Sequence, residues 1–492
     1  METYKNLING EWVASTSTRT IANINPGDTR DIIGHVPLAT RDEALAAIEA
    51  AAAAAEMWRR TPTPKRGAIV TKAARLMEDR REAIARTLTR EEGKLLAESR
   101  GEVQRSINIA EFCGAYSRLL GGQQVPLELA NNLGYTVRRP LGPVALITPW
   151  NFPVAIPVWK IAPALVAGCP IVFKPATITP GSAMLVAQCF LDAGLPPGVL
   201  NMIFGAGSEV GSVLIDHPAI HGVSFTGSTE IGNDVYQRAA ARGARAQCEL
   251  GGKNPVIVCD DADLDLAVAG VLAGAFGSTG QRCTATSRVI LQHPVADAFL
   301  EKLVAGVQAL RAGPGLDESS TLAPSVDEGQ MTKVLEYIAI ARAEGADLLC
   351  GGERLTAGDL AHGFFIAPTV FDRVRPAMRI AQEEVFGPVL SCIRVESFED
   401  AIAAANDSAF GLTSSIYTRD GARMFRYIDE VETGILHVNS PTLGGEAQMP
   451  FGGMKATGIG PREQGTEVFD FYTETQAVYI DYTGTKREGK LY

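Results

Sequence analysis

The chain has 492 residues, of which 46% are apolar and 21% charged, and its 56 acidic and 45 basic residues give a net charge of −11. These proportions are typical of globular proteins and exclude a mainly disordered chain. Nucleic acids and anionic membranes are bound through basic surfaces, so the acidic balance predicts neither as a partner.

The first residues show no signal-peptide pattern. Residues 140–159 are uncharged and long enough to span a bilayer, but five prolines exclude a lipid-facing helix there. The eight cysteines are scattered singly, with no Cys-x-x-Cys pair and no His at metal-ligand spacing. We therefore expect a reduced, cytoplasmic protein without a disulfide framework or a metal site.

The N-terminal third is predicted to be mostly helical. Asn9-Gly10 indicates a hairpin, and helical patterns follow at 42–58 and through 61–116, where acidic and basic residues interleave. A strand is predicted at 135–138, after the glycine pair at 121–122.

From residue 144 onward, strands and helices alternate. The first series has strands at 144–148, 171–174, 200–204 and 222–226, and helices at 159–167, 182–193, 207–216 and 229–242. A second series begins near residue 251 and continues to about 438. Such alternation predicts the α/β class, here two doubly wound parallel sheets joined near residues 250–252. A lone strand at 475–480 is expected to pair outside its own domain.

A glycine turn follows the strand at 222–226. Gly227 and Ser228 lead into a helix, so backbone N–H groups there are free to bind a phosphate. The spacing from Gly227 to Gly232 is not the usual dinucleotide fingerprint, and an ordinary tight turn explains the segment at least as well.

Cys283 differs from the other cysteines because its surroundings are polar and irregular. Cys169, Cys259 and Cys350 stand in apolar segments typical of small buried side chains. Cys283 follows Arg282, which could favour the nucleophilic thiolate. From this context alone, a nucleophile and an inert thiol are equally good interpretations.

Four further polar residues stand where chemistry is possible. Glu249 ends an apolar strand, where a raised pKa would suit a general base, although a salt bridge to Lys253 is the commoner arrangement. Asn151, held between prolines, could stabilise an oxyanion or simply form a turn. Lys174 ends a strand at the expected ligand crevice, or is solvated there. Glu384 could equally be a surface residue.

Seven segments taken together carry a specific resemblance. In order, they are Pro149-Trp150-Asn151-Phe152-Pro153, Phe173-Lys174-Pro175-Ala176, Phe225-Thr226-Gly227-Ser228, Glu249-Leu250-Gly251-Gly252-Lys253, Gly280-Gln281-Arg282-Cys283, Glu384-Val385-Phe386-Gly387-Pro388 and Pro450-Phe451-Gly452-Gly453. Over nearly its whole length, the chain resembles the NAD(P)-dependent aldehyde dehydrogenases.

The resemblance implies oxidation of an aldehyde to a carboxylic acid. Cys283 matches the nucleophile that forms a thiohemiacetal and then a thioester. Glu249 matches the general base that hydrolyses the thioester, and Asn151 matches the oxyanion donor, helped by the backbone N–H of Cys283. Relatives that transfer the acyl group to coenzyme A tend to lack the glutamate, so its presence favours hydrolysis.

The resemblance also implies a cofactor site and an assembly. Lys174 matches the residue that holds the adenosine ribose, and Gly227 and Ser228 match the turn that binds the pyrophosphate. Glu384 matches the residue that binds the nicotinamide ribose. Phe386 matches the residue that packs beside the nicotinamide, and Trp150 matches a residue near the cofactor. The implied domains are a Rossmann-like cofactor domain of residues 1–120 and 141–250, a catalytic domain of 251–470, and an oligomerisation arm of 121–140 and 471–492. A homodimer or homotetramer is expected.

Thr177 departs from the pattern of strictly NAD-using relatives. Many of them have Glu at this position, three residues after the lysine, to bind the adenosine-ribose hydroxyls. A carboxylate would repel a 2′-phosphate, whereas a hydroxyl can hydrogen-bond to it. We therefore expect NADP to be accepted, with or without NAD.

For the substrate, the sequence is most similar to bacterial α-ketoglutaric semialdehyde (2,5-dioxopentanoate) dehydrogenases. Arg282 is a candidate for binding a substrate carboxylate, and an arginine turned to solvent or another subunit is equally consistent.

Trp159 stands where many succinic semialdehyde dehydrogenases have arginine. With Phe152 and Phe451 it suggests an apolar wall. Succinic semialdehyde and medium-chain or aromatic aldehydes therefore stay as alternatives, with a non-redox thiol esterase or structural relative more distant.

Overall fold

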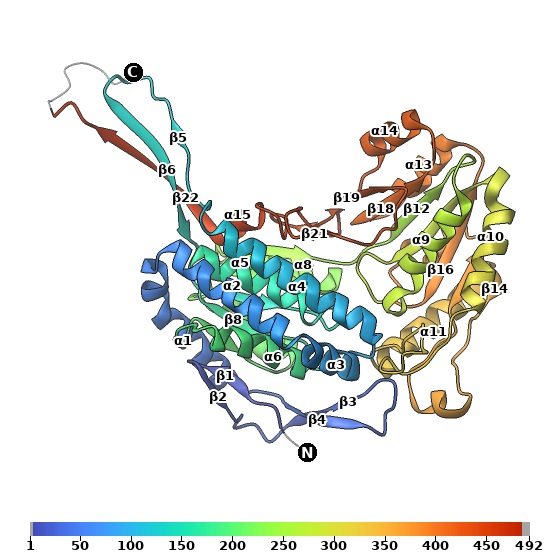
Figure 1. The fold of residues 1–492 in the computed structure, drawn as a ribbon, viewed down its shortest axis with the longest axis horizontal. Coiled ribbons are helices and arrows are strands. Elements are labelled where there is room, and N and C mark those ends of the chain that lie inside the picture. The colour runs from blue at the N-terminus through green and yellow to red at the C-terminus, as the bar shows by residue number, and fades with distance from the viewer. Residues whose placement is uncertain (1–2, 485–492) are drawn as a thin grey trace.

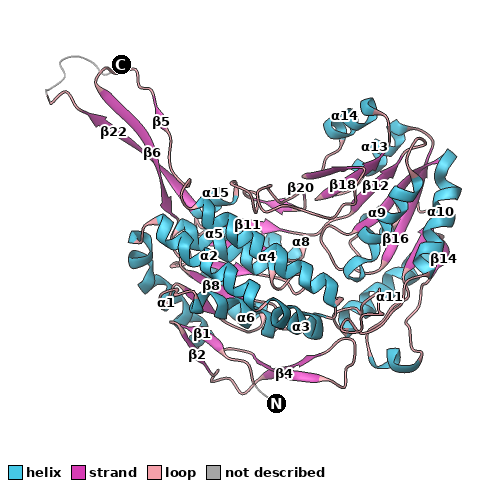
Figure 2. Ribbon diagram, in the orientation of Figure 1, coloured by secondary structure: helices cyan, strands magenta, loops and turns pink. Residues whose placement is uncertain are grey.

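The computed structural model describes residues 3–484. Two α/β domains lie side by side, and a β arm projects from the first of them (Figure 1). Helices cover both faces of each central sheet (Figure 2), as the alternating pattern predicts.

The first domain is built on an eight-stranded sheet in the order β2-β1-β9-β8-β7-β10-β11-β21. Strands β7 to β11 are parallel, whereas β1 and β21 join antiparallel. The strands are β1 (Asn6–Ile8), β2 (Glu11–Val13), β7 (Val144–Ile147), β8 (Ile171–Lys174), β9 (Leu200–Met202), β10 (Gly222–Thr226), β11 (Arg245–Glu249) and β21 (Gly458–Ile459). A hairpin of β3 (Thr20–Ile24) and β4 (Ile32–Pro37) lies outside this sheet.

Alternating side chains on these strands build two separate cores. Leu146 and Phe173 pack in one core with α2, α4, α5 and α6, and their neighbours Ala145 and Val172 pack in the other with α1, α7 and α8. The helices are α1 (Arg41–Arg60), α2 (Thr63–Asp79), α3 (Arg81–Glu92), α4 (Leu96–Tyr116), α5 (Ala155–Ala167), α6 (Pro180–Asp192), α7 (Ser212–Asp216) and α8 (Thr229–Ala241). This two-sided burial confirms the doubly wound prediction.

The second domain has a seven-stranded sheet in the order β14-β15-β16-β13-β12-β18-β19, with only β14 antiparallel to its neighbour. Its strands are β12 (Asn254–Val258), β13 (Thr286–Gln292), β14 (Asp347–Cys350), β15 (Thr369–Asp372), β16 (Val389–Val395), β18 (Thr413–Tyr417) and β19 (Ile435–Val438). Its helices are α9 (Leu264–Phe276), α10 (His293–Gln308), α11 (Glu328–Ala343), α12 (Arg379–Gln382), α13 (Phe398–Asn406) and α14 (Gly421–Glu430).

The chain returns to the first domain before its end. The sequence analysis assigns all of 251–470 to the catalytic domain, but β21 pairs with the edge strand β11 of the first sheet. Phe469 of α15 (Val468–Tyr472) is buried in the core of the first domain. These residues cover an edge that β11 would otherwise expose, so the first domain includes them.

The projecting arm is a three-stranded sheet. β22 (Thr473–Asp481) pairs along its whole length with β6 (Asn132–Pro140), and β5 (Gln124–Val125) pairs on the other side of β6. The tail strand thus finds its partner outside both α/β domains, as predicted. Residues 485–492 of the expected oligomerisation arm lie outside the described residues. Between residues 3 and 484, no helix is both long and apolar enough to cross a membrane.

Candidate active site

Cys283 stands on a tight loop between α9 and β13. Ser278, Thr279 and Gly280 all have positive φ values, of 48°, 56° and 68°, a conformation that is costly for the first two. A Cβ at Gly280 would lie 2.2 Å from the Gly387 carbonyl oxygen, so only glycine fits. The loop therefore brings the half-buried Cys283 close to the first domain.

The loop is fixed by hydrogen bonds from both domains. The carboxylate of Glu98, on α4 of the first domain, accepts the N–H of Ser278 at 2.6 Å. Thr279 donates to the Ala323 carbonyl oxygen at 2.9 Å, and Asn254 donates to the carbonyl oxygen of Cys283 at 2.7 Å. These contacts offset the backbone strain and hold the thiol in one place.

Asn151 follows the C-terminal end of β7 and is buried. Its Nδ2 donates to the carbonyl oxygen of Gln281 at 3.1 Å, which places an amide donor beside Cys283. The backbone oxygen of Asn151 accepts a hydrogen bond from Lys94 Nζ at 2.5 Å. The asparagine is therefore part of a rigid donor group and not merely a turn residue.

A buried ion pair holds the segment that carries Asn151. Glu102 of α4 accepts from Lys94 Nζ at 2.7 Å. The same carboxylate accepts the N–H groups of Val154 and Ala155, at 2.8 and 3.1 Å. Glu102 thus satisfies free donors at the start of α5 while it neutralises Lys94.

Replacing Glu102 by alanine is expected to lower the free energy of unfolding by about 3–5 kcal/mol, because it leaves the buried Lys94 with only the more distant carboxylate of Glu92, 3.9 Å away. Equilibrium urea unfolding measures this. Glu111→Ala, an exposed position on the same helix, is the matched control and should cost under ~1 kcal/mol. A Glu102→Ala protein as stable as the control would contradict the structural role.

Glu249 ends β11 and is only 3% exposed. Burial and the nearby Glu463 raise its pKa well above the ordinary value, against the opposing effect of Lys160 and Arg462. Its Oε1 is buried without a hydrogen-bond partner. The predicted alternative, a salt bridge to Lys253, is not formed among the described residues, so Glu249 is a buried carboxyl with a high affinity for a proton.

The buried neighbour of Glu249 is an ion pair across the first domain. Lys160 of α5 pairs with Glu463 and donates to Ser224 Oγ at 2.7 Å. Ser224 in turn donates to Gln247 Oε1 at 2.9 Å. Glu463 is therefore held as a fixed negative charge, and Glu249 has reason to stay protonated.

The thiol of Cys283 is also held in its protonated form. Burial, Glu249 and Glu384 together raise its pKa to about 12, against the opposing effect of Arg105. The arginine that favours the thiolate is thus Arg105 of α4. The prediction that Arg282 does so was wrong, because its charge is taken by Glu98.

A cavity of about 180 Å³ opens between the two domains at Cys283. It gathers many of the predicted site residues: Trp150, Asn151, Gly227, Ser228, Cys283, Glu384 and Phe386. Gln330 and Lys333 of α11 line it as well. The sequence did not indicate Gln330 and Lys333, because polar residues in a helix usually lie on its solvated face.

The cavity wall suits a dinucleotide. Ser228 precedes the first turn of α8 and forms no side-chain cap, so the helix N–H groups are open to an anion. Thr226 Oγ1 is buried without a partner. A Cβ at Gly227 would meet the Phe225 ring at 2.5 Å, which restricts this position to glycine. The free N–H groups of α8, the unpartnered hydroxyl of Thr226 and the backbone at Gly227, which carries no side chain, together fit a bound phosphate group.

Lys174 and Thr177 lie at the end of β8. Lys174 is only 7% exposed, and burial lowers its pKa to about 8. The alternative of a freely solvated lysine is therefore wrong. Thr177 is half-buried in the turn that follows.

Glu384 and Phe386 belong to the second domain. Glu384 Oε1 accepts the N–H of Gly252 at 3.0 Å, so it is not the surface residue of the alternative interpretation. Phe386 has a φ of 61° and packs edge-on against Trp150, with ring centroids 5.5 Å apart. The two rings close the cavity next to Cys283.

Comparison with known proteins decides the family. The sequence profile of the aldehyde dehydrogenase family matches residues 12–478. The chain belongs to the aldehyde dehydrogenase family. It is 45% identical to a Bacillus subtilis protein named alpha-ketoglutaric semialdehyde dehydrogenase, over 97% of this chain and 98% of that protein.

Two further members of the family also match the chain over nearly its whole length. A Saccharolobus solfataricus protein named 2,5-dioxopentanoate dehydrogenase is 42% identical, over 97% of this chain and 99% of that protein. The crystal structure of a betaine aldehyde dehydrogenase from Staphylococcus aureus in complex with NAD⁺ superposes with a TM-score of 0.95 at 36% identity, covering 98% of this chain and 95% of that chain.

In this aldehyde dehydrogenase, Arg282 has a partner that neither prediction named. Its Nη2 lies 3.1 Å from Glu98 Oε1, and its Nε donates to Ser278 Oγ at 2.9 Å. The guanidinium also lies over the Phe152 ring, 5.8 Å from its centroid. These contacts tie Arg282 to its own loop and to α4.

The predicted apolar wall is formed in part. Trp159 and Phe451 are almost fully buried and contact each other, with ring centroids 5.3 Å apart. Phe152 is half-buried, and Lys94 lies 4.2 Å from its ring centroid. The guanidinium of Arg105 lies 5.5 Å from the Trp159 ring, so this wall includes a cation that sequence analysis did not find.

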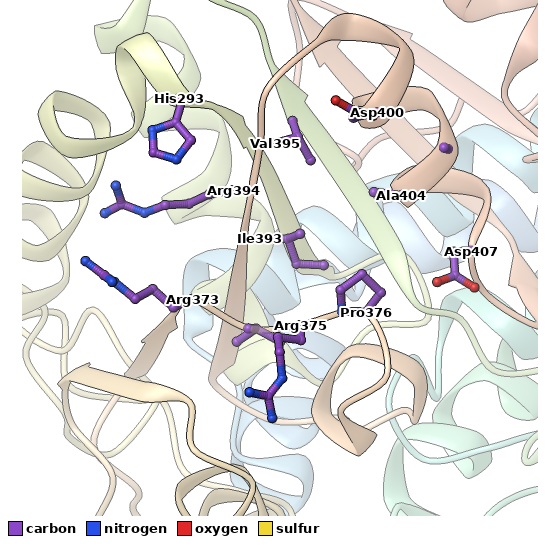
Figure 3. Close-up of a pocket in the computed structure, with 12 residues that line it drawn as sticks. His293, Arg373, Arg375, Pro376, Ile393, Arg394, Val395, Asp400, Ala404 and Asp407 are labelled. Carbon is purple, nitrogen blue, oxygen red and sulfur yellow. The ribbon is translucent and has the colours of Figure 1, made fainter.

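A larger hollow in the second domain is a weaker candidate for a site. Figure 3 shows His293, Arg373 and Arg394 on one side of it and Asp400 and Asp407 on the other. Arg394 is paired with Asp372 and Asp297, and Arg373 with Asp347. Two of its three arginines are therefore already neutralised. Within residues 3–484, no cluster of three metal-binding side chains occurs.

Proposed function

We propose that this aldehyde dehydrogenase oxidises an aldehyde to a carboxylic acid with NAD or NADP, through a covalent intermediate on Cys283. One observation carries the proposal: a thiol and an amide donor line one cavity together with a wall that suits a dinucleotide, and the buried carboxyl of Glu249 is close enough to act on the pKa of that thiol. A thiol esterase would need the thiol, the amide donor and the carboxyl but not that wall.

In the first step, Cys283 Sγ forms a bond to the aldehyde carbon. The electron pair of the C=O bond moves to oxygen, where Asn151 Nδ2 and the backbone N–H of Cys283 stabilise the negative charge. The thiol proton must leave, and Glu249, when ionised, is the base that acts on Cys283 most directly. The raised pKa of Glu249 favours this proton transfer, whereas the raised pKa of the Cys283 thiol opposes it.

The cofactor supplies the hydride acceptor when it is bound. Gly227, Ser228 and the start of α8 would hold its pyrophosphate, Lys174 its adenosine ribose and Glu384 its nicotinamide ribose. Trp150 and Phe386 would then exclude water beside Cys283. Loss of a hydride from the carbon bonded to sulfur, with return of the oxyanion electron pair to the C–O bond, leaves a thioester on Cys283.

Once it has released the thiol proton to solvent, Glu249 completes the reaction by taking a proton from water. The water oxygen adds to the thioester carbon, the C–S bond breaks, and the carboxylic acid is released while Cys283 regains a proton. The same amide donors stabilise the second oxyanion. Two additions to carbon, each with a fixed charge-stabilising site, thus replace one difficult oxidation.

We propose α-ketoglutaric semialdehyde as the substrate, supported by the names of the two relatives above. The test is the rate of nicotinamide reduction with this compound, succinic semialdehyde, pentanal and benzaldehyde. A preference for α-ketoglutaric semialdehyde supports the proposal, and a preference for pentanal or benzaldehyde would contradict the substrate. No reduction with any aldehyde, alongside ester hydrolysis without cofactor, would establish the esterase alternative.

Replacing Thr177 by glutamate is expected to lower kcat/KM for NADP by roughly tenfold or more, because a carboxylate repels the 2′-phosphate. The kcat/KM for NAD should change much less. Initial rates with each cofactor measure both values, and Thr177→Gln is the uncharged control of equal size. Equal losses for the two cofactors would contradict the assignment of Thr177 to the ribose site.

We also propose that the arm assembles the protein into a homodimer or homotetramer. Among residues 3–484, β22 and β5 are the edge strands of the arm sheet, and Tyr479 of β22 is 72% exposed. Such edges are usually covered. Sedimentation at micromolar concentration tests this, and a monomer would overturn it.

A further inference from the structure

Arg105 is a half-buried cation that forms no ion pair among the described residues. It lies on α4, its Nε is buried with no hydrogen-bond partner, and its Nη2 makes only a long contact, of 3.5 Å, to Gln464 Oε1. None of the ion pairs among the described residues includes it. Burial lowers the pKa of Arg105 below its ordinary value, although Glu102 acts in the opposite direction.

The two acidic groups that precede Arg105 on α4 are committed elsewhere, and Glu111 and Glu446, which line the same cavity, form no ion pair with it. Glu102, on the same helix, pairs with Lys94 and accepts two N–H groups of α5. Glu98, one turn earlier, pairs with Arg282. An unpaired buried charge is costly unless an anion is supplied from outside the fold.

The surroundings of Arg105 are shaped for a flat, charged partner. The guanidinium lies 5.5 Å from the centroid of the Trp159 ring and 6.0 Å from that of Phe451. Aromatic neighbours orient the planar group and leave its N–H donors for a carboxylate, which guanidinium can bind in a bidentate manner.

Arg105 also lies where a substrate must pass. It lines a cavity of about 1000 Å³ between α4 and residues 444–448. It is also close enough to Cys283 to act on the pKa of its thiol. The cofactor cavity, on the other side of Cys283, does not include Arg105. Arg105 therefore faces the non-reacting end of a molecule whose aldehyde carbon is at Cys283.

We propose that Arg105 binds the carboxylate of the substrate and so selects aldehydes that carry an anionic end. This inference rests on the proposed function and names the residue that gives it specificity. It replaces Arg282 in that role, since Glu98 already neutralises Arg282.

The test compares two aldehydes of the same chain length in wild type and Arg105→Gln. The ratio of kcat/KM for α-ketoglutaric semialdehyde to that for pentanal is expected to fall roughly 10- to 100-fold, because one charge-assisted contact is lost. The loss should appear mainly in KM for the charged aldehyde. Arg105→Lys should restore part of the ratio.

Arg118→Gln is the matched control, an exposed arginine just beyond the end of α4, and should leave the ratio unchanged. Thermal melting and dinucleotide binding establish that each variant is folded. An unchanged ratio in Arg105→Gln, whatever its absolute rate, would overturn the inference while an active wild type leaves the proposed function standing. A wild type that oxidises no aldehyde would overturn both.

Discussion

Replacing Cys283 by alanine is expected to reduce kcat/KM for aldehyde oxidation on the order of 10⁴-fold or more. The substitution removes the sulfur atom that forms the covalent intermediate, and loss of a nucleophile typically has effects of this size. Asn151 and the cofactor residues cannot replace it, because they stabilise charge but do not bond to carbon. Initial rates of nicotinamide reduction at saturating cofactor measure the loss.

Cys350→Ala is the matched control for this experiment. Cys350 is a half-buried free cysteine at the end of the edge strand β14, in the outermost position of the second sheet. It should retain full activity, and both variants should bind dinucleotide as the wild type does. A Cys283→Ala protein within tenfold of the wild-type rate would show that the reaction does not use this thiol.

Replacing Glu249 by glutamine is expected to separate the two halves of the reaction. Hydrolysis of the thioester needs a base to take a proton from water, whereas hydride loss does not. Rapid mixing with saturating aldehyde and cofactor should therefore give a burst of about one reduced nicotinamide per active site, followed by almost no turnover. The burst itself will be slower than in wild type, because Glu249 also receives the thiol proton.

The pH dependence gives the same experiment a second readout. Glu249 is a base only in its ionised form, and its pKa is raised by burial and by Glu463. The steady-state rate of the wild type should therefore increase with pH above the ordinary range of a glutamate. This limb should vanish in Glu249→Gln. Glu336→Gln, an exposed position on α11, is the control. Steady turnover at the wild-type rate in Glu249→Gln, without a burst, would contradict the role.

Much of the fold could be predicted because its signals are local. Apolar strands alternating with amphipathic helices determine a doubly wound sheet, and the alternation of Leu146 and Phe173 with Ala145 and Val172 is what buries both faces. The two-residue strand β21 could not be predicted. Its pairing with β11 depends on an edge formed about 210 residues earlier in the chain and leaves no periodic pattern.

The candidate site also divides into residues that the sequence indicates and residues that only the tertiary structure brings together. Cys283, Glu249 and Asn151 were ambiguous one by one and gained their meaning from the order of seven segments. Lys94, Glu102 and Arg105 gave no such signal, because interleaved charges usually mark a solvated helix face.

One pattern on α4 could have indicated the buried network. Glu98, Glu102 and Arg105 are spaced i, i+4 and i+7 and therefore lie on one side of the helix. That side faces the active site, where it contacts the loop of Cys283, the start of α5 and the Trp159 ring. Recognising the partners still requires the tertiary structure, since Arg282 lies 184 residues from Glu98.

The covalent step at Cys283 is the central claim, and mass spectrometry of the Glu249→Gln variant tests it most directly. The variant is mixed with α-ketoglutaric semialdehyde and cofactor, quenched in acid and digested. We predict that the peptide containing Cys283 gains the mass of the acyl group, in an amount equal to the nicotinamide reduced in the burst. Reduced nicotinamide without an adduct, or an adduct on another cysteine, would contradict the account.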